Sequence, residues 1–393
     1  MHRFIAPKMK LIKPSSLGHI WNRAAQLERE GKEIFHFEIG RPDFDTPAPI
    51  KAAAIKAMEE GKVHYTVPRG IIELREAVAA DLQARLGVSY DPEKEITITI
   101  GAVEGITDIM ITLLEKGDQI LSADPMYLFY LEWGGFMEAE TVSMPTRAEE
   151  DFQISEKALE AGVSDRTKIV IVNSPHNPTG TVLSEESLEA LARVARERDL
   201  LVISDEVYDR LTYPPFKHRS IASLPGMKER TIIVNSFSKP FAMDGWRIGY
   251  MAGPEELIAE LDKAHLRAAT CANTMAQYAA LEALRLGDEL VEPMLARYTA
   301  RRELVLEMID QAPGLSAFRP RGAFYVWLDY GPTGIDDIEV AGELMEKAGV
   351  AVTPGPAFGS GGKEHLRISY AAGRKELERG IPRLIETLQR LKD

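Results

Sequence analysis

The strongest constraint on the fold is a repeated alternation of short apolar runs with longer segments of helical period. Short continuous apolar runs are typical of strands that are buried on both faces of a sheet. The segments between them place apolar residues at helical spacing, which predicts helices that cover such a sheet. We therefore expect an α/β fold with a mostly parallel central sheet flanked by helices. The expected strands of this sheet are residues 96–100, 119–123, 168–172, 200–204 and 231–234.

Helices are expected around these strands. The best marked begins after Ser184, a residue type that caps helix N-termini, with Glu185 and Glu186 in its first turn. In the first half of the chain the expected helices are residues 15–30, 49–61, 72–86, 101–116 and 185–198, and residues 34–39 are expected to form a short strand.

The C-terminal third mixes helices and strands in a different order, which predicts a second, smaller α+β domain. It is mainly helical over residues 254–311, and the expected later elements are a strand at 323–329, a helix at 337–348, short runs at 350–353 and 366–370, and a helix from about 374. We expect residues 46–290 to form the large domain and residues 1–45 with 291–393 to form the small one.

The charge balance argues against two kinds of partner. The 393 residues carry 47 Lys and Arg against 60 Asp and Glu, which gives a formal net charge of −13. Such a field repels nucleic-acid phosphates and anionic lipid headgroups. We expect neither nucleic acid nor a membrane as a partner, although arginines and backbone amides can still hold a small anion locally.

The cysteine content and the first residues favour the cytoplasm. The single cysteine, Cys271, cannot form an intramolecular disulfide or a cysteine-based metal site, and we expect it to be a small apolar residue of a helix. The N-terminus has basic residues but no continuous apolar region of a signal peptide. We expect a cytoplasmic enzyme.

One lysine stands out among the candidate site residues. Lys239 lies in the Ser-rich turn Ser236-Phe237-Ser238-Lys239, just past the apolar run 231–234, and Arg247 opens the next apolar run. An amine beside hydroxyls and an arginine suits a group that carries both an aldehyde and a phosphate. Lys239 is therefore the first candidate for a Schiff base.

Other polar or small residues also follow predicted strands, where ligands bind in α/β sheets. Gly101 and Ala102 open a helix after a strand, and unpaired amides at such a helix start bind phosphate. Their spacing matches neither the dinucleotide-binding nor the P-loop pattern. The remaining candidates are the turn at Gly40, the loop Asn177-Pro178-Thr179-Gly180 and the acid of Asp205-Glu206-Val207-Tyr208.

Taken in order, these motifs resemble those of the class I/II aminotransferases, fold type I enzymes that use pyridoxal 5′-phosphate (PLP). The resemblance covers nearly the whole chain. The residues that carry it are Gly101, Ala102, Tyr127, Asn177 to Gly180, Asp205, Tyr208, Ser236, Ser238, Lys239, Arg247 and Arg367.

The resemblance implies a role for each residue that would act on the PLP ring. Lys239 would hold PLP as a covalent Schiff base and would act as general acid and base, which requires a lowered pKa. Asp205 would face the ring nitrogen and keep it protonated. Asn177 and Tyr208 would donate to the ring oxygen, and Tyr127 would stack on the ring.

The resemblance also implies contacts to the phosphate and to the substrate. Gly101, Ala102, Ser236, Ser238 and Arg247 would hold the phosphate, and position 103 (Val103) would lie beside them at the cofactor. The other implied contacts are Tyr65, which would reach the phosphate of the neighbouring subunit in a homodimer; Arg367, which would grip the substrate carboxylate together with Asn177; and Gly40, whose backbone would close over the substrate.

Two positions depart from the family pattern. Asp244 stands near the phosphate-binding residues where many relatives have a small or hydroxylated residue, so its carboxylate must point away or be paired. Val103 replaces a lysine that aspartate-specific relatives often carry, which disfavours aspartate. We expect His176 and His218 to be structural, and we expect no catalytic metal because the histidines lack a metal-binding spacing.

These inferences predict a PLP-dependent aminotransferase that moves the amino group of an L-amino acid to a 2-oxo acid by a ping-pong route. On family grounds, the expected acceptor is 2-oxoglutarate. One alternative is a PLP-dependent C–S β-lyase of the same fold, because the cofactor-binding residues would hardly change. The other is a non-catalytic PLP-binding regulator, which the acidic charge and the early start of the enzyme-like part oppose.

Overall fold

The computed structural model describes residues 4–12 and 16–392, and its centre is a seven-stranded sheet. The sheet order is β2-β8-β7-β6-β5-β3-β4, and every neighbouring pair is parallel except the two that β8 makes. The strands are β2 (Ile96–Thr99), β3 (Gln119–Asp124), β4 (Glu140–Pro145), β5 (Thr167–Asn173), β6 (Leu201–Asp205), β7 (Thr231–Ser236) and β8 (Gly249–Ala252). The expected mostly parallel sheet flanked by helices is confirmed.

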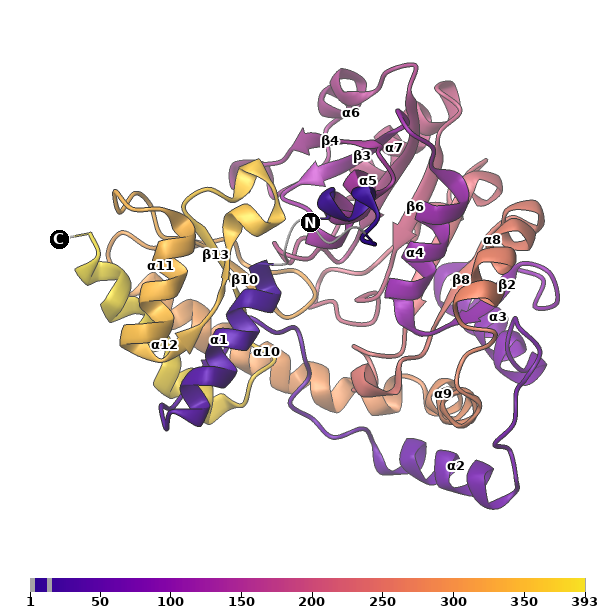
Figure 1. Cartoon of the computed structure of the whole chain (residues 1–393), viewed down its shortest axis with the longest axis horizontal. Helices are drawn as coiled ribbons and strands as arrows, with labels where there is room; N and C mark the ends of the chain where they lie inside the picture. The colour runs from indigo at the N-terminus through magenta and orange to yellow at the C-terminus, as the bar shows by residue number, and fades with distance from the viewer. Residues whose placement is uncertain (1–3, 13–15, 393) are drawn as a thin grey trace.

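Helices cover both faces of this sheet (Figure 1). On β5 the side chains alternate between the two faces: Val170 and Val172 join one apolar cluster, and Ile169 and Ile171 join the other. The first cluster is completed by α6 (Glu156–Gly162) and α7 (Glu185–Glu197), and the second by α4 (Gly101–Leu113), α5 (Leu128–Phe136) and α8 (Glu255–Ala268). Ser184 caps α7 as expected, because its hydroxyl accepts the amide of Ser187.

A second body, drawn in orange, yellow and indigo in Figure 1, lies beside the large sheet. It contains a four-stranded sheet of order β12-β13-β10-β9 and the parallel pair β1-β11. Its strands are β1 (Phe35–His36), β9 (Ser316–Ala317), β10 (Tyr325–Asp329), β11 (Val350–Ala351), β12 (Thr353–Pro354) and β13 (His365–Ser369). Its helices are α1 (Ser16–Arg29), α11 (Asp337–Glu343), α12 (Arg374–Arg390) and the C-terminal part of α10 (Asp288–Asp310).

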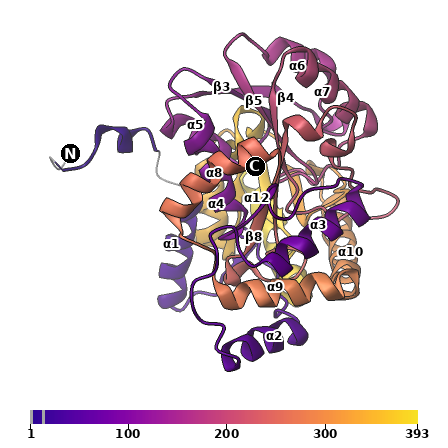
Figure 2. The same ribbon diagram turned by 90° about the vertical axis from the view of Figure 1, so that its right-hand side faces the viewer.

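Three further helices pack at one end of the large sheet. They are α2 (Ala48–Glu59), α3 (Ile72–Leu86) and α9 (Thr274–Leu286). Figure 2 shows α2 beneath α9, and these two helices share an extensive contact. N-terminal and C-terminal segments share one body because β1 pairs with β11. The domain limits at residues 45 and 290 stay a prediction.

The structure differs from the sequence-based expectation in several elements. The strand β4 and the helices α5 and α6 were not expected; β4 is an edge strand whose mostly half-exposed residues lack a continuous apolar run. The expected strand at residues 34–39 shrinks to Phe35–His36, because only β11 pairs with it. Cys271 lies in the bend between α8 and α9 rather than in a helix, since Asn273 starts α9 by capping the amide of Ala276. None of the helices within the described residues combines the length and apolar character needed to span a membrane.

Candidate functional site

The candidate site is a cavity of about 220 Å³ at the carboxyl edge of the large sheet, facing the small sheet. The sheet places three polar residues side by side at this edge, because Asn173 of β5 is in register with Asp205 of β6, and Ser236 ends the next strand. The small sheet contributes Tyr325 and Arg367. Parallel strands thus bring together residues that are far apart in sequence.

The Lys239 amine lies within this cavity and donates to the backbone oxygen of Gly40 at 2.7 Å. Burial disfavours the charged ammonium and lowers the pKa of Lys239 to about 8, although the Asp244 carboxylate opposes this shift. Arg367 and Arg247 lower the pKa further, because like charges repel the ammonium. About one tenth of the amine is therefore neutral at pH 7, far more than for an ordinary lysine, and this fraction can act as a nucleophile or base.

Asp205, the last residue of β6, is a buried carboxyl group whose oxygens face two donors. The Tyr130 hydroxyl donates to Oδ2 at 2.5 Å, and the Val207 amide donates to Oδ1 at 3.3 Å. Burial raises the pKa of Asp205 to about 6, while these two hydrogen bonds limit the rise. The group remains mostly ionised at pH 7 and can pair with a cation in the cavity.

An anion site lies where α4 begins. Gly101 has a φ of +73°, and a side chain there would lie 2.8 Å from Nη2 of Arg247. The following residue, Ala102, lines the cavity together with Ser236, Ser238 and Arg247. Ser236 donates to the Ser238 hydroxyl at 2.8 Å. Helix amides, two hydroxyls and one guanidinium are the groups expected around a phosphate.

Arg367, on β13, is a buried cation that retains an unused donor. Its guanidinium donates to Oδ1 of Asn177 at 3.1 Å and to the Glu38 carbonyl at 2.5 Å. The Tyr325 ring lies 4.5 Å from the guanidinium carbon, and the Phe358 ring 4.9 Å. Its Nε has no hydrogen-bond partner. A buried donor without a partner is costly, so this position favours an incoming carboxylate.

The proposed donors to the ring oxygen also lie in this cavity. Asn177 lies in the loop after β5. Its backbone amide donates to Oδ1 of Asn173 at 2.7 Å, which fixes the loop. The Tyr208 hydroxyl lies 2.8 Å from that of Tyr325. Tyr127, which caps α5 and lines the cavity, packs edge-on against Tyr130 with the ring centroids 5.5 Å apart.

Two backbone or apolar positions complete the wall. A side chain at Gly40 would lie 1.8 Å from the Tyr325 hydroxyl, so only glycine allows the approach that brings its carbonyl to Lys239. Val103, Ile39 and Trp21 also line the cavity. Trp21 belongs to α1, so the N-terminal helix reaches the cavity from the small-domain side.

Tyr65 and Asp244 do not line this cavity. Tyr65 is 86% exposed in its own chain. Asp244 lines a neighbouring groove with Arg41 and Asn273, and its backbone oxygen accepts from Arg247 at 2.9 Å. Its carboxylate is nevertheless close enough to Lys239 to oppose the lowering of the pKa of that amine.

The two histidines are buried outside the cavity. His176 has its Nδ1 2.8 Å from the Thr179 hydroxyl, and burial lowers its pKa to about 4. His218 contacts the Glu206 carboxylate across 3.1 Å. Both placements agree with the structural role expected of them.

Sequence reasoning gave no site role to Tyr325, Asn173 and Trp21, which line the cavity, or to Tyr130, which donates to Asp205 from behind it. Tyr325 belonged to the expected strand 323–329, and Trp21 was one apolar position of the expected helix 15–30. Asn173 directly followed the expected strand 168–172. Only the fold reveals their places, because none of the four stands in a motif.

Comparison with known proteins gives the family to which the chain is similar over nearly its whole length. Residues 32–384 match the family model "Aminotransferase class I and II". The chain is 40% identical to an aspartate aminotransferase of Pyrococcus abyssi and 38% identical to aromatic-amino-acid aminotransferase 2 of Thermococcus litoralis, with 99% of each chain covered in both cases. It superposes on the aspartate aminotransferase from Thermus thermophilus with maleate with a TM-score of 0.92, at 37% identity, over 98% of this chain and 100% of that one.

Enzymes of this family depend on PLP, and the cavity offers a buried amine, a buried acid and an anion site in one place. The chain belongs to the class I and II aminotransferases.

Proposed function

We propose that this aminotransferase moves the α-amino group of an L-amino acid to a 2-oxo acid, with 2-oxoglutarate as the acceptor, in a ping-pong sequence at the cavity around Lys239. The observation that carries the proposal is the convergence of Lys239, Asp205 and Arg367 on one cavity. A nucleophilic amine, a partner for a ring nitrogen and a carboxylate anchor are the three groups that amino transfer on PLP needs.

The donor set fits PLP on two independent observations. First, the Arg247 guanidinium lies so close to the start of α4 that Gly101 cannot carry a side chain, which leaves the helix amides open to an anion. Second, Lys239 has the lowered pKa that an amine needs to bind an aldehyde. Bound there, PLP would supply an electron sink that stabilises the substrate carbanion.

The residues of this chain then have separate tasks. Arg367 holds the α-carboxylate of the substrate through the donor that has no partner, and it orients the Cα–H bond toward Lys239. Lys239 would accept the proton from the substrate Cα and serve as the proton donor in the second half of the transfer. Asp205 would hold the ring nitrogen of PLP, Asn177 and Tyr208 its ring oxygen, and Tyr127 its ring face. The carbonyl of Gly40 accepts a hydrogen bond from the free Lys239 amine and so orients it before PLP is bound.

We also propose a homodimer in which Tyr65 reaches the phosphate of the neighbouring subunit. The support is that a large side chain is 86% exposed beside Val67, which is 57% exposed, in the loop before α3. Solvent exposure of neighbouring apolar groups favours burial against another chain. The cytoplasmic location stays a prediction.

A spectrum of the purified enzyme tests the catalytic proposal. Wild type and Lys239→Ala are saturated with PLP, and each is mixed with aspartate, glutamate, phenylalanine, tyrosine or leucine without any oxo acid. A productive donor should bleach the visible band of the wild type, and 2-oxoglutarate should restore it. Lys263→Ala on α8, whose side chain is exposed, is the matched control and should behave like the wild type.

Three results would contradict the proposal. A visible band that survives in Lys239→Ala would remove Lys239 from cofactor attachment. Release of pyruvate and ammonia without an acceptor would support a β-lyase instead. Absence of any response to amino acids, with PLP bound, would favour a binding protein without catalysis.

Mixing variants tests the shared site. Lys239→Ala chains retain Tyr65, and Tyr65→Phe chains retain Lys239, so each mixed dimer contains one complete site. Activity of the refolded mixture should exceed the average of the two separate variants. Equality with that average would show that Tyr65 does not act across subunits.

A further inference from the structure

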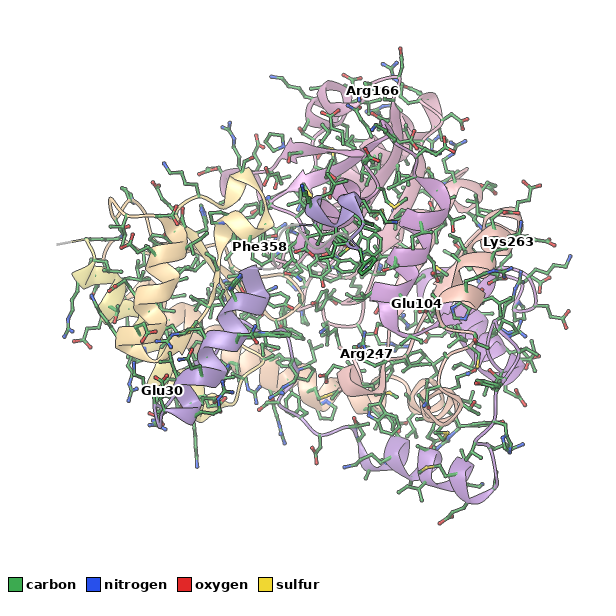
Figure 3. The ribbon with its side chains drawn as sticks, viewed as in Figure 1. Glu30, Glu104, Arg166, Arg247, Lys263 and Phe358 are labelled. Atoms are coloured by element: carbon green, nitrogen blue, oxygen red, sulfur yellow. The ribbon has the colours of Figure 1, made fainter. Side chains whose placement is uncertain are left out.

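A second cluster of ligand-type side chains lies outside the cofactor cavity, between α4 and α8. Glu104 and Asp108 lie one turn apart on α4, and His265 projects from α8. Among the described residues, one oxygen of each carboxylate and one nitrogen of the imidazole lie within 4.8 Å of one another. Figure 3 labels Glu104 on α4, on the side near α8, where Lys263 is also labelled.

Asp108 is the unusual member of this cluster. Its side chain is fully buried, and neither carboxylate oxygen has a hydrogen-bond partner. The nearest cationic group is His265, whose Nδ1 lies 3.9 Å from Oδ2. Burial and the neighbouring Glu104 carboxylate raise the pKa of Asp108 to about 8. A buried pair of carboxylates that faces one imidazole requires either a proton or a cation to balance its charge.

The surrounding charges do not supply that balance. Asp262, one turn before His265 on α8, pairs with Arg69 and also accepts from the Thr97 hydroxyl at 2.6 Å. Arg69 is therefore already engaged with a third carboxylate. The cluster of Glu104, Asp108 and His265 is left with two acidic groups and one titratable base.

The contacts behind the cluster orient its ligand atoms. Nε2 of His265 lies 2.9 Å from the Pro68 carbonyl, which makes Nε2 the donor and leaves Nδ1 facing the carboxylates. Oε2 of Glu104 accepts the Ile100 amide at 2.7 Å, which leaves Oε1 facing the imidazole. Metal-binding histidines and carboxylates are commonly held by such outer hydrogen bonds.

We propose that Glu104, Asp108 and His265 bind one divalent cation of the zinc type. One imidazole nitrogen and two carboxylate oxygens form a ligand set that Zn²⁺ accepts, and tetrahedral bonds of about 2.0–2.1 Å would place ligand atoms roughly 3.4 Å apart. The present separations from Nδ1 bracket that value, at 2.6 Å to Glu104 and 3.9 Å to Asp108. The two carboxylate oxygens lie within 4.8 Å of each other, so small side-chain rotations would complete three sides of the site.

Such an ion would be structural rather than catalytic. It would link α8 to the first two turns of α4, the helix whose opposite side presents Ala102, Val103 and Ile106 to the cofactor cavity.

Calorimetric titration of the chelator-treated holoenzyme with ZnCl₂ tests this site. Wild type should bind one Zn²⁺ per chain with a rise in melting temperature, and Asp108→Asn and His265→Gln should each bind at least ten times more weakly. His36→Gln is the matched control, because His36 also contacts two carboxylates, Glu38 at 2.9 Å and Glu28 at 3.2 Å. These two use different ring nitrogens and cannot share one ion, so this variant should bind as the wild type does.

A second measurement does not depend on any variant folding. Co²⁺ added to wild type should give the intense visible absorption of a four-coordinate ion, and one equivalent of Zn²⁺ should abolish it. No saturable binding by wild type, or equal binding by Asp108→Asn, would overturn the proposal. A chelator-treated Asp108→Asn that melts above wild type, with no effect of Zn²⁺ on wild type, would show that a proton fills the cluster instead.

Discussion

The Arg367 guanidinium donates to the side-chain oxygen of Asn177 at 3.1 Å, and this bond joins the small sheet to the loop after β5 of the large sheet. Arg367 is thereby held over the cavity from both sides, because it also donates to the Glu38 carbonyl. The group that we assign to the substrate carboxylate thus contacts a group that we assign to the cofactor. Binding of substrate and position of the cofactor ring are coupled through these two side chains.

Arg367→Lys should impair substrate use far more than PLP binding. Lysine keeps the charge but loses the planar pair of donors, and charge-assisted hydrogen bonds contribute about 1.5–3 kcal/mol each. We expect kcat/KM to fall by roughly 10²–10³-fold, mainly through KM for the amino donor. Steady-state kinetics and PLP titration check this. Arg379→Lys, an exposed arginine that pairs with Glu33, is the control. An equal loss of PLP affinity would contradict the assignment.

Tyr130→Phe should raise the pKa of Asp205. The variant removes the hydroxyl donor at 2.5 Å, and that donor stabilises the ionised carboxylate. The pKa of Asp205 should rise from about 6 by about one to two units, since that is the shift to which a charge-assisted hydrogen bond of about 1.5–3 kcal/mol corresponds. A larger fraction of Asp205 is then neutral at pH 7.

The pH dependence of PLP affinity for the apoenzyme reports this shift. Affinity should be high above the pKa of Asp205 and should fall below it, with the acid limb moved upward in Tyr130→Phe. Tyr90→Phe is the matched control, because Tyr90 is also buried and its hydroxyl has no partner. Superimposable limbs for wild type and Tyr130→Phe would refute the role of Tyr130.

Lys239 in the apoenzyme should titrate near pH 8. Burial penalises the ammonium, so the proton leaves at a lower pH, and about half of the amine is neutral at pH 8. An ordinary lysine would be roughly 0.3% neutral at that pH. Asp244→Asn removes a carboxylate that favours the ammonium and should lower the pKa of Lys239 further. Competitive acetylation followed by mass spectrometry measures both, with surface lysines of the same digest as references. Labelling of Lys239 like those references would contradict the expectation.

Gly249→Ala should destabilise the start of α4 and weaken PLP binding. A side chain there would lie 2.6 Å from the Asn235 carbonyl and 2.9 Å from the Ala102 amide, and backbone atoms cannot move aside cheaply. Overpacking of this kind costs about 1–3 kcal/mol. Thermal melting and PLP titration should both respond. Gly245→Ala is the control, because no atom lies within 4 Å of its added carbon. Equal melting temperatures for the two variants would show that the strand pair adjusts.

The sequence predicts the sheet and the polar ends of its strands, because parallel strands that are buried on both faces consist of continuous apolar residues. It predicts Lys239, Asp205 and Asn177 for the same reason, since each stands at such an end. It does not predict β4, because an edge strand needs no continuous apolar run. Tyr325 and Tyr130 escape prediction because their aromatic rings fit core positions equally well. Only the fold brings the Tyr325 hydroxyl beside that of Tyr208 in the cavity and the Tyr130 hydroxyl onto Asp205.

The metal-type cluster could not be predicted from spacing either. Glu104 and Asp108 show a helical interval of four, which many surface pairs share. Their third partner, His265, lies on α8 and becomes a neighbour only when α8 packs beside α4. The expectation of no catalytic metal used local histidine spacing, and such spacing cannot detect a site assembled from two helices.

The cavity should favour donors with apolar side chains over aspartate. Among the described residues that line it, the three cations Lys239, Arg247 and Arg367 each have a proposed role at the cofactor or the α-carboxylate. Val103, Trp21, Ile39 and Ile106 also line the cavity and bring no charge. A side-chain carboxylate placed there would lose water without gaining a partner, which is unfavourable.

Val103→Lys should therefore shift the preference toward aspartate. The new ammonium would face the open end of the cavity, and one charge-assisted contact of about 1.5–3 kcal/mol raises the ratio of kcat/KM for aspartate over phenylalanine by at least roughly tenfold. Ile111→Lys is the matched control, since Ile111 lies on the same helix, is 47% exposed and does not line the cavity. Steady-state kinetics with aspartate and with phenylalanine measures this ratio of kcat/KM in each variant. A ratio that changes equally in both variants would show that general charge, rather than a contact at position 103, governs the choice of donor.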